Sequence, residues 1–444
     1  MRIPLIFLIV PVFSEIISAK IYGNIEHFGY YYLEIWVGTP SVRQTVILDT
    51  GSSLTAFPCT GCLSCGEHID SYFDFTKSST FKPVLCTSNI KCSACNNNQC
   101  EYHQSYAEGS SISGILVQDN ISITLSEYPV ASTFGCHLRE TNLFKSQKVD
   151  GIMGLSYKNN EIGSIIDDLF DSRRLGSNSF SLCLGQIEGI LTIGGFNQSL
   201  HLEPIQWIKL YNHEFYSVQA STFKIESKDV LIEPGDFSKM YKTGTIFDSG
   251  TTFVYLTENI YLKVVQGFKE FCKVDGNCRV QTVRVFGEPQ RCYIYDLKKG
   301  FSEFLQGFPE IIVVFDDFVE YRWKPEEYLF AWPESPNYYC VGIYNNFEGG
   351  NVLGGIFMRG KDVVFNRSDD SIGFAFSECG DFGINNRSRS ILPYVSVDND
   401  AKNFSVGLVI LFSCGFMGLV SCIYMLNRKK QQEDPQDSKI IKDI

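Results

Sequence analysis

Dense groups of basic residues are scarce in this sequence. Lysine and arginine together number 38, against 50 aspartate and glutamate residues, and the formal net charge at pH 7 is −12. The only run of three basic residues is Arg428–Lys430, near the C-terminal end. Because proteins bind nucleic acid largely through basic patches, no nucleic-acid partner is expected. The acidic balance favours basic substrates instead.

Helical patterns are also few. Apolar residues recur at helical spacing over residues 258–271, behind the expected N-cap Thr257, and a second helix is expected over residues 163–173. Elsewhere, short alternating stretches are separated by turns with glycine, which is typical of β-strands. We therefore predict an all-β protein. The stretch from 20 to 380 is longer than one core usually organises, so two lobes are expected, 20–205 and 206–380.

Long apolar runs occur at the two ends. The run at residues 3–13 is too short to span a bilayer comfortably and is followed by small residues, so residues 1–19 are interpreted as a secretory signal peptide, with an uncleaved signal anchor as the alternative. The uncharged run of residues 404–426 predicts a transmembrane helix rather than a buried core helix, after a polar stalk at 381–403. The basic residues that follow predict a cytosolic tail, 427–444, and lumenal lobes.

Two stretches repeat one arrangement. Ile47–Ser53 and Ile246–Thr252 each place an aspartate, Asp49 or Asp248, directly after apolar residues and before a glycine-containing turn with hydroxyl side chains. Such a run predicts a buried strand that carries the carboxylate to its end, where glycine permits a sharp turn. Aspartate in a single turn is often only a cap, but duplication in matching surroundings indicates a paired function.

Facing loops of this kind would bring two carboxyls within a few ångströms. Like charges that close do not both ionise, so one proton is shared and one pKa is strongly raised. The ionised carboxylate can take a proton from water while the protonated one donates to a carbonyl oxygen. Such a pair hydrolyses an amide without a covalent intermediate, a metal or another cofactor, and the shared proton belongs to the pair rather than to one residue.

Cysteines are numerous and unevenly divided. Of the sixteen, Cys414 and Cys422 lie in the expected membrane segment. The first lobe holds nine of the others and the second holds five, so complete pairing requires at least one disulfide between lobes, and Cys183–Cys379 is the candidate. The disulfide candidates are Cys59, Cys62, Cys65, Cys86, Cys92, Cys95, Cys100, Cys136, Cys183, Cys272, Cys278, Cys292, Cys340 and Cys379.

The cysteines between residues 59 and 100 form a dense insert. The spacing of Cys59, Cys62 and Cys65, with His68 nearby, would suit a metal site. Behind a secretion signal, disulfides are the better interpretation, because an oxidising lumen favours them over thiolate clusters. No metal is therefore expected.

The duplicated loops are similar to the Asp-Thr-Gly-Ser and Asp-Ser-Gly-Thr signatures of the pepsin-like aspartic proteases. Val149–Leu155 and Val352–Phe357 resemble the segments that pass behind each catalytic loop in that family. Phe57–His68 looks like the nepenthesin-type insert, and Cys100–Ser110 looks like the flap hairpin of plasmepsin V-like members. The resemblance covers both lobes and is densest over Asp49–Leu155. It implies a bilobal pepsin-like fold.

The resemblance also implies roles for single residues. Asp49 and Asp248 match the catalytic pair. The residues that match the support of this pair are Thr50 and Ser249, which tie the loops together, Ser52 and Thr251, which are outer carboxylate partners, and the glycines Gly51 and Gly250.

A flap over residues 102–114 is expected to close on substrate. Tyr106 matches the flap tyrosine, and Gly109 suits a hairpin tip that lifts and settles. In plasmepsin V-like members, the acid matching Glu108 meets the arginine of an R-x-L substrate motif, and Gln147 matches a second arginine contact. A solvated turn residue is the alternative for Glu108.

Two positions depart from these patterns. Ala107 stands where plasmepsin V-like members carry a cysteine, which removes an odd thiol but leaves the carboxyl pair untouched. Ala56 stands where pepsin has the tryptophan that bonds the flap tyrosine. Flap closure must therefore be secured in another way.

The resulting hypothesis is a single-pass type I membrane glycoprotein that acts as an aspartic endopeptidase on extended polypeptides in the secretory pathway, in the endoplasmic reticulum or a later compartment. Three alternatives remain open. They are a memapsin-like convertase of an acidic compartment, a non-catalytic peptide-binding protein of the same fold, and a membrane receptor of another fold.

Overall fold

The computed structural model describes residues 16–126, 128–158, 162–211, 213–230, 244–275, 280–285, 288–296, 298, 300–332, 335–346 and 349–380. The predicted stalk, transmembrane helix and cytosolic tail lie outside these ranges, as does most of the predicted signal segment. Within them, no helix is long and apolar enough to cross a membrane.

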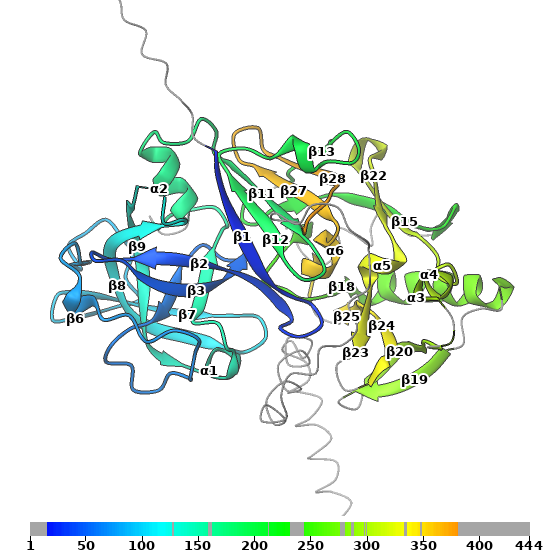
Figure 1. Ribbon diagram of the computed structural model, residues 1–444, viewed down its shortest axis with the longest axis horizontal. Helices are drawn as coiled ribbons and strands as arrows, with labels where there is room; N and C mark the ends of the chain where they lie inside the picture. The colour runs from blue at the N-terminus through cyan, green and yellow to red at the C-terminus, as the bar shows by residue number, and fades with distance from the viewer. Residues whose placement is uncertain are drawn as a thin grey trace, which may run out of the picture.

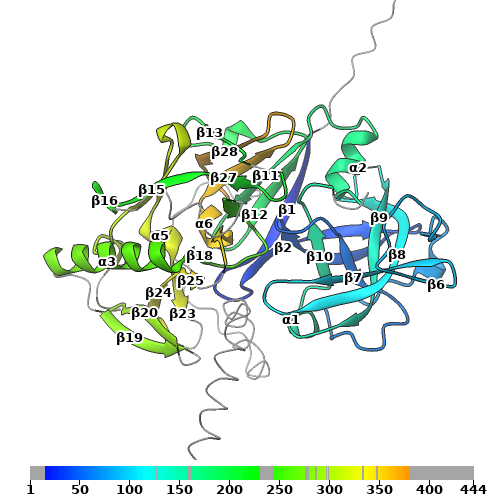
Figure 2. The same cartoon turned by 180° about the vertical axis from the view of Figure 1, so that it is seen from behind.

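Strands dominate the molecule, which confirms the mostly β fold. Figure 1 shows two lobes side by side, one built mainly from the blue and cyan strands and the other from the green and yellow ones, and Figure 2 shows the same division from behind. The first half of the chain forms β1 Ile17–Asn24, β2 Tyr30–Val37, β3 Val42–Asp49, β4 Ala56–Pro58, β5 Lys82–Pro83, β6 Ala94–Asn96, β7 Gln99–Ser105, β8 Ser111–Ser122, β9 Val130–Glu140, α1 Leu143–Ser146, β10 Gly151–Gly154, α2 Ile165–Asp171, β11 Ser179–Leu184 and β12 Gly189–Ile193.

The second half contributes further short strands and four of the α-helices that the structure describes. Its elements are β13 Gln206–Lys209, β14 Ser217–Val218, β15 Ala220–Ile225, β16 Lys228–Val230, β17 Thr245–Phe247, β18 Val254–Thr257, α3 Glu258–Asp275, β19 Val280–Val285, β20 Glu288–Ile294, α4 Phe301–Leu305, β21 Ile311–Phe315, β22 Glu320–Trp323, α5 Pro325–Tyr328, β23 Leu329–Trp332, β24 Ser335–Val341, β25 Ile343–Asn346, β26 Asn351–Leu353, α6 Gly355–Met358, β27 Lys361–Asn366 and β28 Ser371–Phe376.

One large sheet joins the two halves. Its order runs β13-β28-β27-β11-β12-β1-β2-β3-β10-β4-β9-β8-β7-β6, so β11 of the first half and β27 near the end of the folded chain are hydrogen-bonded neighbours. At the junction, β11 pairs with β27, and the rings of Phe180 and Phe365 stack with centroids 4.8 Å apart. The disulfide Cys183–Cys379 closes the same region and confirms the pairing expected from cysteine parity.

Strand β1 begins at Ile17 and pairs with β12, with Ile17 opposite Ile193. Alternate residues of β1, from Ile17 to Ile21, are buried in the core. The boundary expected at residue 19 therefore falls inside a strand of the folded body.

The disulfide interpretation of the insert is confirmed. Its seven cysteines form the bonds Cys59–Cys136, Cys62–Cys65, Cys86–Cys95 and Cys92–Cys100, which fasten the insert to itself and to β9. In the second lobe, Cys292 is bonded to Cys340. Because these sulfurs are in disulfides, they offer no thiolates to a metal ion.

The two expected helices are present as α2 and α3. Ser164 precedes α2 and forms a capping box with Asp167, which explains why the helix starts there. Thr257 directly precedes α3, but its hydroxyl is buried and finds no hydrogen-bond partner in the described part of the chain. The expected side-chain cap is therefore wrong, because Thr257 ends strand β18 and its backbone N–H is taken by Asn351 Oδ1 at 2.9 Å.

Candidate active site

Each aspartate stands where a short strand ends. Asp49 is the last residue of β3, and Asp248 directly follows β17. Each strand is paired in parallel with a segment that passes behind the loop: β3 with β10, and β17 with β26. In both lobes this segment also pairs antiparallel with the strand after the loop, β4 or β18. The duplicated sequence thus folds into duplicated local structure.

Reciprocal hydrogen bonds join the two loops. Thr50 Oγ1 accepts from Ser249 N at 2.9 Å and donates to Phe247 O at 3.0 Å. Ser249 Oγ accepts from Thr50 N at 3.1 Å and donates to Leu48 O at 2.8 Å. Thr50 and Ser249 are fully or almost fully buried. Each hydroxyl therefore bonds to backbone of the opposite lobe and fixes the distance between the loops.

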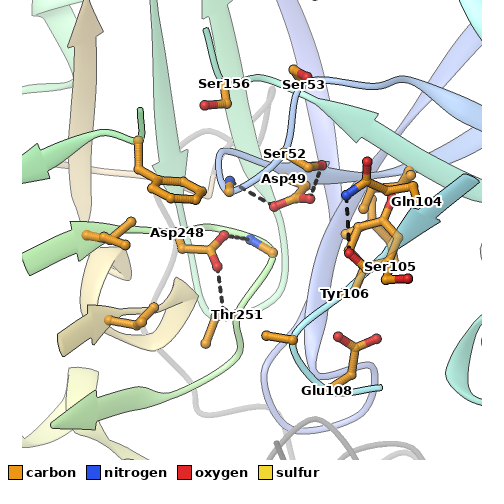
Figure 3. A pocket seen from close by; sticks show the side chains of 18 of the residues that line it. Asp49, Ser52, Ser53, Gln104, Ser105, Tyr106, Glu108, Ser156, Asp248 and Thr251 are labelled. Carbon is orange, nitrogen blue, oxygen red and sulfur yellow. Dashed lines mark hydrogen bonds between the residues drawn. The ribbon is translucent and has the colours of Figure 1, made fainter. Parts of the chain in front are cut away.

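The carboxylates have matching partners within their own loops. Asp49 accepts from Gly51 N at 2.9 Å and from Ser52 Oγ. Asp248 accepts from Gly250 N at 2.9 Å and from Thr251 Oγ1 at 2.6 Å. Figure 3 shows these bonds and the two aspartates among the residues that line the pocket.

Both glycines lie against the opposite carboxylate. A Cβ added at Gly51 would come 2.7 Å from Asp248 Oδ1, and one added at Gly250 would come 2.3 Å from Asp49 Oδ1. Only glycine permits this approach without displacement of the carboxyl. Burial raises the pKa of Asp49 well above its ordinary value, the neighbouring Asp248 raises it further, and hydrogen bonds from Ser52 and Gly51 oppose the rise.

A cleft of about 1010 Å³ lies over this pair. Its walls come from both lobes, from the flap and from α1, which suits an extended ligand that passes between the lobes. The lining residues include Asp49, Gly51, Ser52, Gln104, Tyr106, Glu108, Phe144, Gln147, Asp248, Gly250 and Thr251.

The flap is the hairpin of β7 and β8, and its turn spans residues 106–110. Tyr106 N donates to Ser110 O at 2.9 Å, and Gly109 N donates to Tyr106 O at 3.0 Å. Gly109 has φ +88°, and an added Cβ there would meet no atom within 4 Å, as expected for a free tip. The Tyr106 ring packs on Phe144, with centroids 5.0 Å apart.

Glu108 and Gln147 both line the cleft. The half-buried Glu108 lies near the flap tip, below Tyr106 in Figure 3. Burial raises the pKa of Glu108, hydrogen bonds from Ser110 oppose this, and the charge of Asp248 adds a smaller rise. Gln147 is almost fully buried, and its side-chain N–H donates to Val149 O at 3.0 Å.

Sequence reasoning missed several residues of the opposite wall. Tyr157, His213 and Tyr255 also line the cleft. The Tyr157 ring lies 5.4 Å from the His213 ring, between centroids. Tyr157 follows the Val149–Leu155 segment closely and could have been found from that position. His213 and Tyr255 carry no comparable local signal.

Comparison with known proteins adds independent evidence. A family model described as eukaryotic aspartyl protease matches residues 30–377. Aspartic protease 5 of Toxoplasma gondii is 32% identical over 411 residues, which cover 87% of this chain and 40% of that protein. Plasmepsin V of Plasmodium falciparum (isolate 3D7) is 25% identical over 469 residues, which cover 87% of this chain and 77% of that protein. Aspartic proteinase nepenthesin-1 of Nepenthes gracilis is 26% identical over 364 residues, which cover 79% of this chain and 78% of that protein.

Proposed function

Since this chain belongs to the eukaryotic aspartyl protease family and is an aspartic-type endopeptidase of pepsin-like fold, we propose that Asp49 and Asp248 are its catalytic pair. This proposal rests on how closely the glycine of each loop approaches the carboxylate of the other loop. A Cβ added at Gly51 would lie 2.7 Å from Asp248 Oδ1, and one added at Gly250 would lie 2.3 Å from Asp49 Oδ1. Two carboxyls in this arrangement share one proton.

The reaction follows from the shared proton. The ionised carboxylate takes a proton from a water molecule, which attacks the carbonyl carbon of the scissile peptide. The protonated carboxyl donates its proton to the carbonyl oxygen, so no free oxyanion accumulates. Ser52 and Thr251 hold the outer carboxylate oxygens, and Thr50 and Ser249 keep the loops at a fixed distance. The gem-diol formed in this way then collapses. The C–N bond breaks as the carboxyl that took the proton from water gives it to the leaving nitrogen, and a diol hydroxyl returns its proton to the other carboxylate, so the pair again holds one proton. No covalent bond forms between enzyme and substrate.

We further propose that the substrate carries arginine two residues before an apolar, leucine-like residue at the cut. Glu108 supplies the negative charge, because its carboxylate lines the cleft near the flap tip and can receive a guanidinium bidentately. Gln147 is proposed as a second contact. Its side-chain N–H is engaged with Val149 O, so the carbonyl oxygen of its amide is the group for arginine.

The proposed setting is the secretory pathway. The disulfides of the insert and Cys183–Cys379 suit an oxidising compartment, and the relatives include plasmepsin V. Attachment to the membrane through residues 404–426 is proposed from their hydropathy alone.

The function is tested with matched peptides that carry R-x-L or A-x-L, assayed at pH 5 and pH 7 with wild-type enzyme and with Asp49→Asn. Preference for the arginine peptide, abolished cleavage in the variant and products that end at the leucine-like residue are the expected results. Equal cleavage of both peptides would refute the arginine subsite. Unchanged cleavage by Asp49→Asn would refute the catalytic pair.

A further inference from the structure

Three ionisable side chains lie buried behind the cleft wall. They are His68 of the insert and His137 and Glu140 of β9, and all three side chains are 0% exposed. Glu140 Oε2 lies 3.2 Å from His68 Nε2, and Glu140 Oε1 lies 2.9 Å from His137 Nδ1. The backbone N–H of Gly66 also donates to Glu140 Oε2, at 3.0 Å. Neither histidine nor Glu140 takes part in the reaction proposed above.

Each ring nitrogen of His68 faces an oxygen atom. Its Nε2 faces a carboxylate oxygen of Glu140, and its Nδ1 faces the carbonyl oxygen of Gln147 at 3.2 Å. A carbonyl oxygen and a carboxylate oxygen are both acceptors, so each ring nitrogen is placed to donate a hydrogen bond. Burial alone would raise the pKa of Glu140, but hydrogen bonds from His137 and His68 bring that pKa below its ordinary value. His68 and Glu140 therefore form a buried ion pair.

His137 is held in the neutral form. Its Nδ1 donates to Glu140, whereas its Nε2 is buried and has no hydrogen-bond partner among the residues that the structure describes. Burial lowers the pKa of His137, while the bond to Glu140 opposes this. A second proton on Nε2 would be a buried donor without an acceptor. The three side chains thus carry one positive and one negative charge.

The other titratable groups around this cluster are neutral or exposed. Tyr72 of the insert donates to a backbone carbonyl at 2.7 Å, and Tyr102 of β7 is buried. Burial raises the pKa of both phenols, and the charge of Glu140 adds to it. The charged residues Glu67, Arg139 and Lys145, on the insert, β9 and α1, are exposed. The His68–Glu140 pair is therefore the charged contact between the insert and β9 at this point.

The short helix α1 is held at its C-terminal end by this pair. The Gln147 carbonyl, which accepts from His68, belongs to the C-cap residue of α1. The insert approaches the helix so closely that a Cβ added at Gly66 would come 2.0 Å from Lys145 O. Ile69 N also donates to Lys148 O at 2.8 Å.

The N-terminal end of α1 is held by the flap. Asn142 donates from its side chain to Gly109 O at 2.7 Å, and Leu143 N donates to Ser110 Oγ at 3.2 Å. Between the two ends, Phe144 packs against the flap residue Tyr106 and against the His137 ring, at 5.0 and 6.0 Å between centroids. The helix therefore links the insert to the flap.

From these contacts we infer that His68 and Glu140 are positioning residues. Their ion pair holds α1, and α1 places Phe144 and Gln147 in the cleft wall and supports the closed flap. This role replaces the tryptophan-to-tyrosine bond that Ala56 excludes. The expected effect on kinetics rests on the proposed function, because it requires peptidase activity. The expected charge state of His68 does not rest on that function.

The charge state is tested by NMR of wild-type protein labelled with ¹⁵N-histidine. The sequence has only six histidines, so His68→Gln assigns the His68 signals by their loss. Two protonated ring nitrogens at neutral pH are expected for His68, and one protonated nitrogen for His137. A singly protonated His68 would overturn the inference. This measurement does not require peptidase activity. If His68→Gln does not fold, the His68 signals are assigned by elimination, with single variants of the exposed histidines His27, His103 and His213.

The positioning role is tested by kinetics of His68→Gln and Glu140→Gln. We expect kcat/KM to fall roughly 10- to 100-fold, with a lower kcat and a higher KM, because a displaced wall misplaces substrate and flap together. The matched control is His201→Gln. His201 pairs with the buried Asp362 at 2.9 Å, and neither residue lines the cleft.

The His201→Gln control is expected to lose thermal stability but to keep kcat/KM within about twofold of wild type. The His201–Asp362 contact lies outside the cleft lining, and mutations at distant sites act independently. If His68→Gln and the control have equal kcat/KM, the pair is only structural and the inference is wrong. Wild-type protein without peptidase activity would refute the proposed function instead, and the NMR result would then decide the charge state separately.

Discussion

Gly250 lies against the Asp49 carboxylate, so close that an added Cβ would come 2.3 Å from Oδ1. Gly250→Ala must therefore displace the carboxyl or part the loops. We expect kcat/KM to fall roughly 100-fold, because small shifts of reacting groups are costly. The control is Gly300→Ala, since a Cβ there meets no atom within 4 Å. Near-wild-type activity of Gly250→Ala in a steady-state peptide assay would contradict the proposed pair.

The raised pKa of Asp49 predicts a pH-dependent stability. A carboxyl whose pKa is higher in the folded state contributes stability below its unfolded pKa and loses that contribution as pH rises through the folded value. Asp49→Asn removes the buried charge and should raise the melting temperature at neutral pH, with a gain that shrinks toward pH 4. Activity should fall roughly 10³-fold or more. A lower melting temperature of this variant at pH 7 would contradict the assignment.

Glu108→Gln should remove most of the preference for arginine over alanine in R-x-L peptides. A hydrogen bond to a charged group is worth about 1.5–3 kcal/mol, so the ratio of kcat/KM values should fall roughly 10- to 100-fold. Because burial raises the pKa of Glu108, the wild-type preference should weaken as the pH falls and the carboxylate takes up a proton. Glu101→Gln, on the same hairpin outside the cleft lining, is the control and should keep the preference.

The disulfide Cys183–Cys379 should contribute more stability than Cys62–Cys65. The first closes a loop of sequence separation 196, and the second closes one of only 3. Loop entropy predicts losses of about 5 and about 2 kcal/mol in the free energy of unfolding when each pair is replaced by alanine. Urea unfolding of the two double variants measures this difference. Equal losses would contradict the prediction, because the entropy of the closed loop acts in the unfolded chain, where the two loops differ in length.

Local pattern predicted a large part of the fold. The helices at residues 163–173 and 258–271 are found as α2 and α3, because their apolar spacing and the capping box at Ser164 are contained within a few residues. The side-chain cap at Thr257 was wrong, since β18 extends to that residue and Asn351, distant in sequence, takes its backbone N–H.

The candidate site also combines features that local sequence predicts with features that only the folded structure shows. The sequence alone shows the carboxyl, hydroxyl and glycine residues of the site, because they occur together in Asp49–Ser52 and again in Asp248–Thr251. The odd cysteine counts of the two halves require at least one disulfide between them, and the candidate Cys183–Cys379 is found in the structure.

Other relationships follow only from the way distant segments meet. Thr50 and Ser249 exchange hydrogen bonds across a separation of 199 residues, and His68 reaches Glu140 across 72. Residue type and spacing reveal chemistry within one segment, because a strand or a turn is set by its own few residues. Which buried donor meets which acceptor depends on how both lobes close, and that is decided by packing of the whole chain.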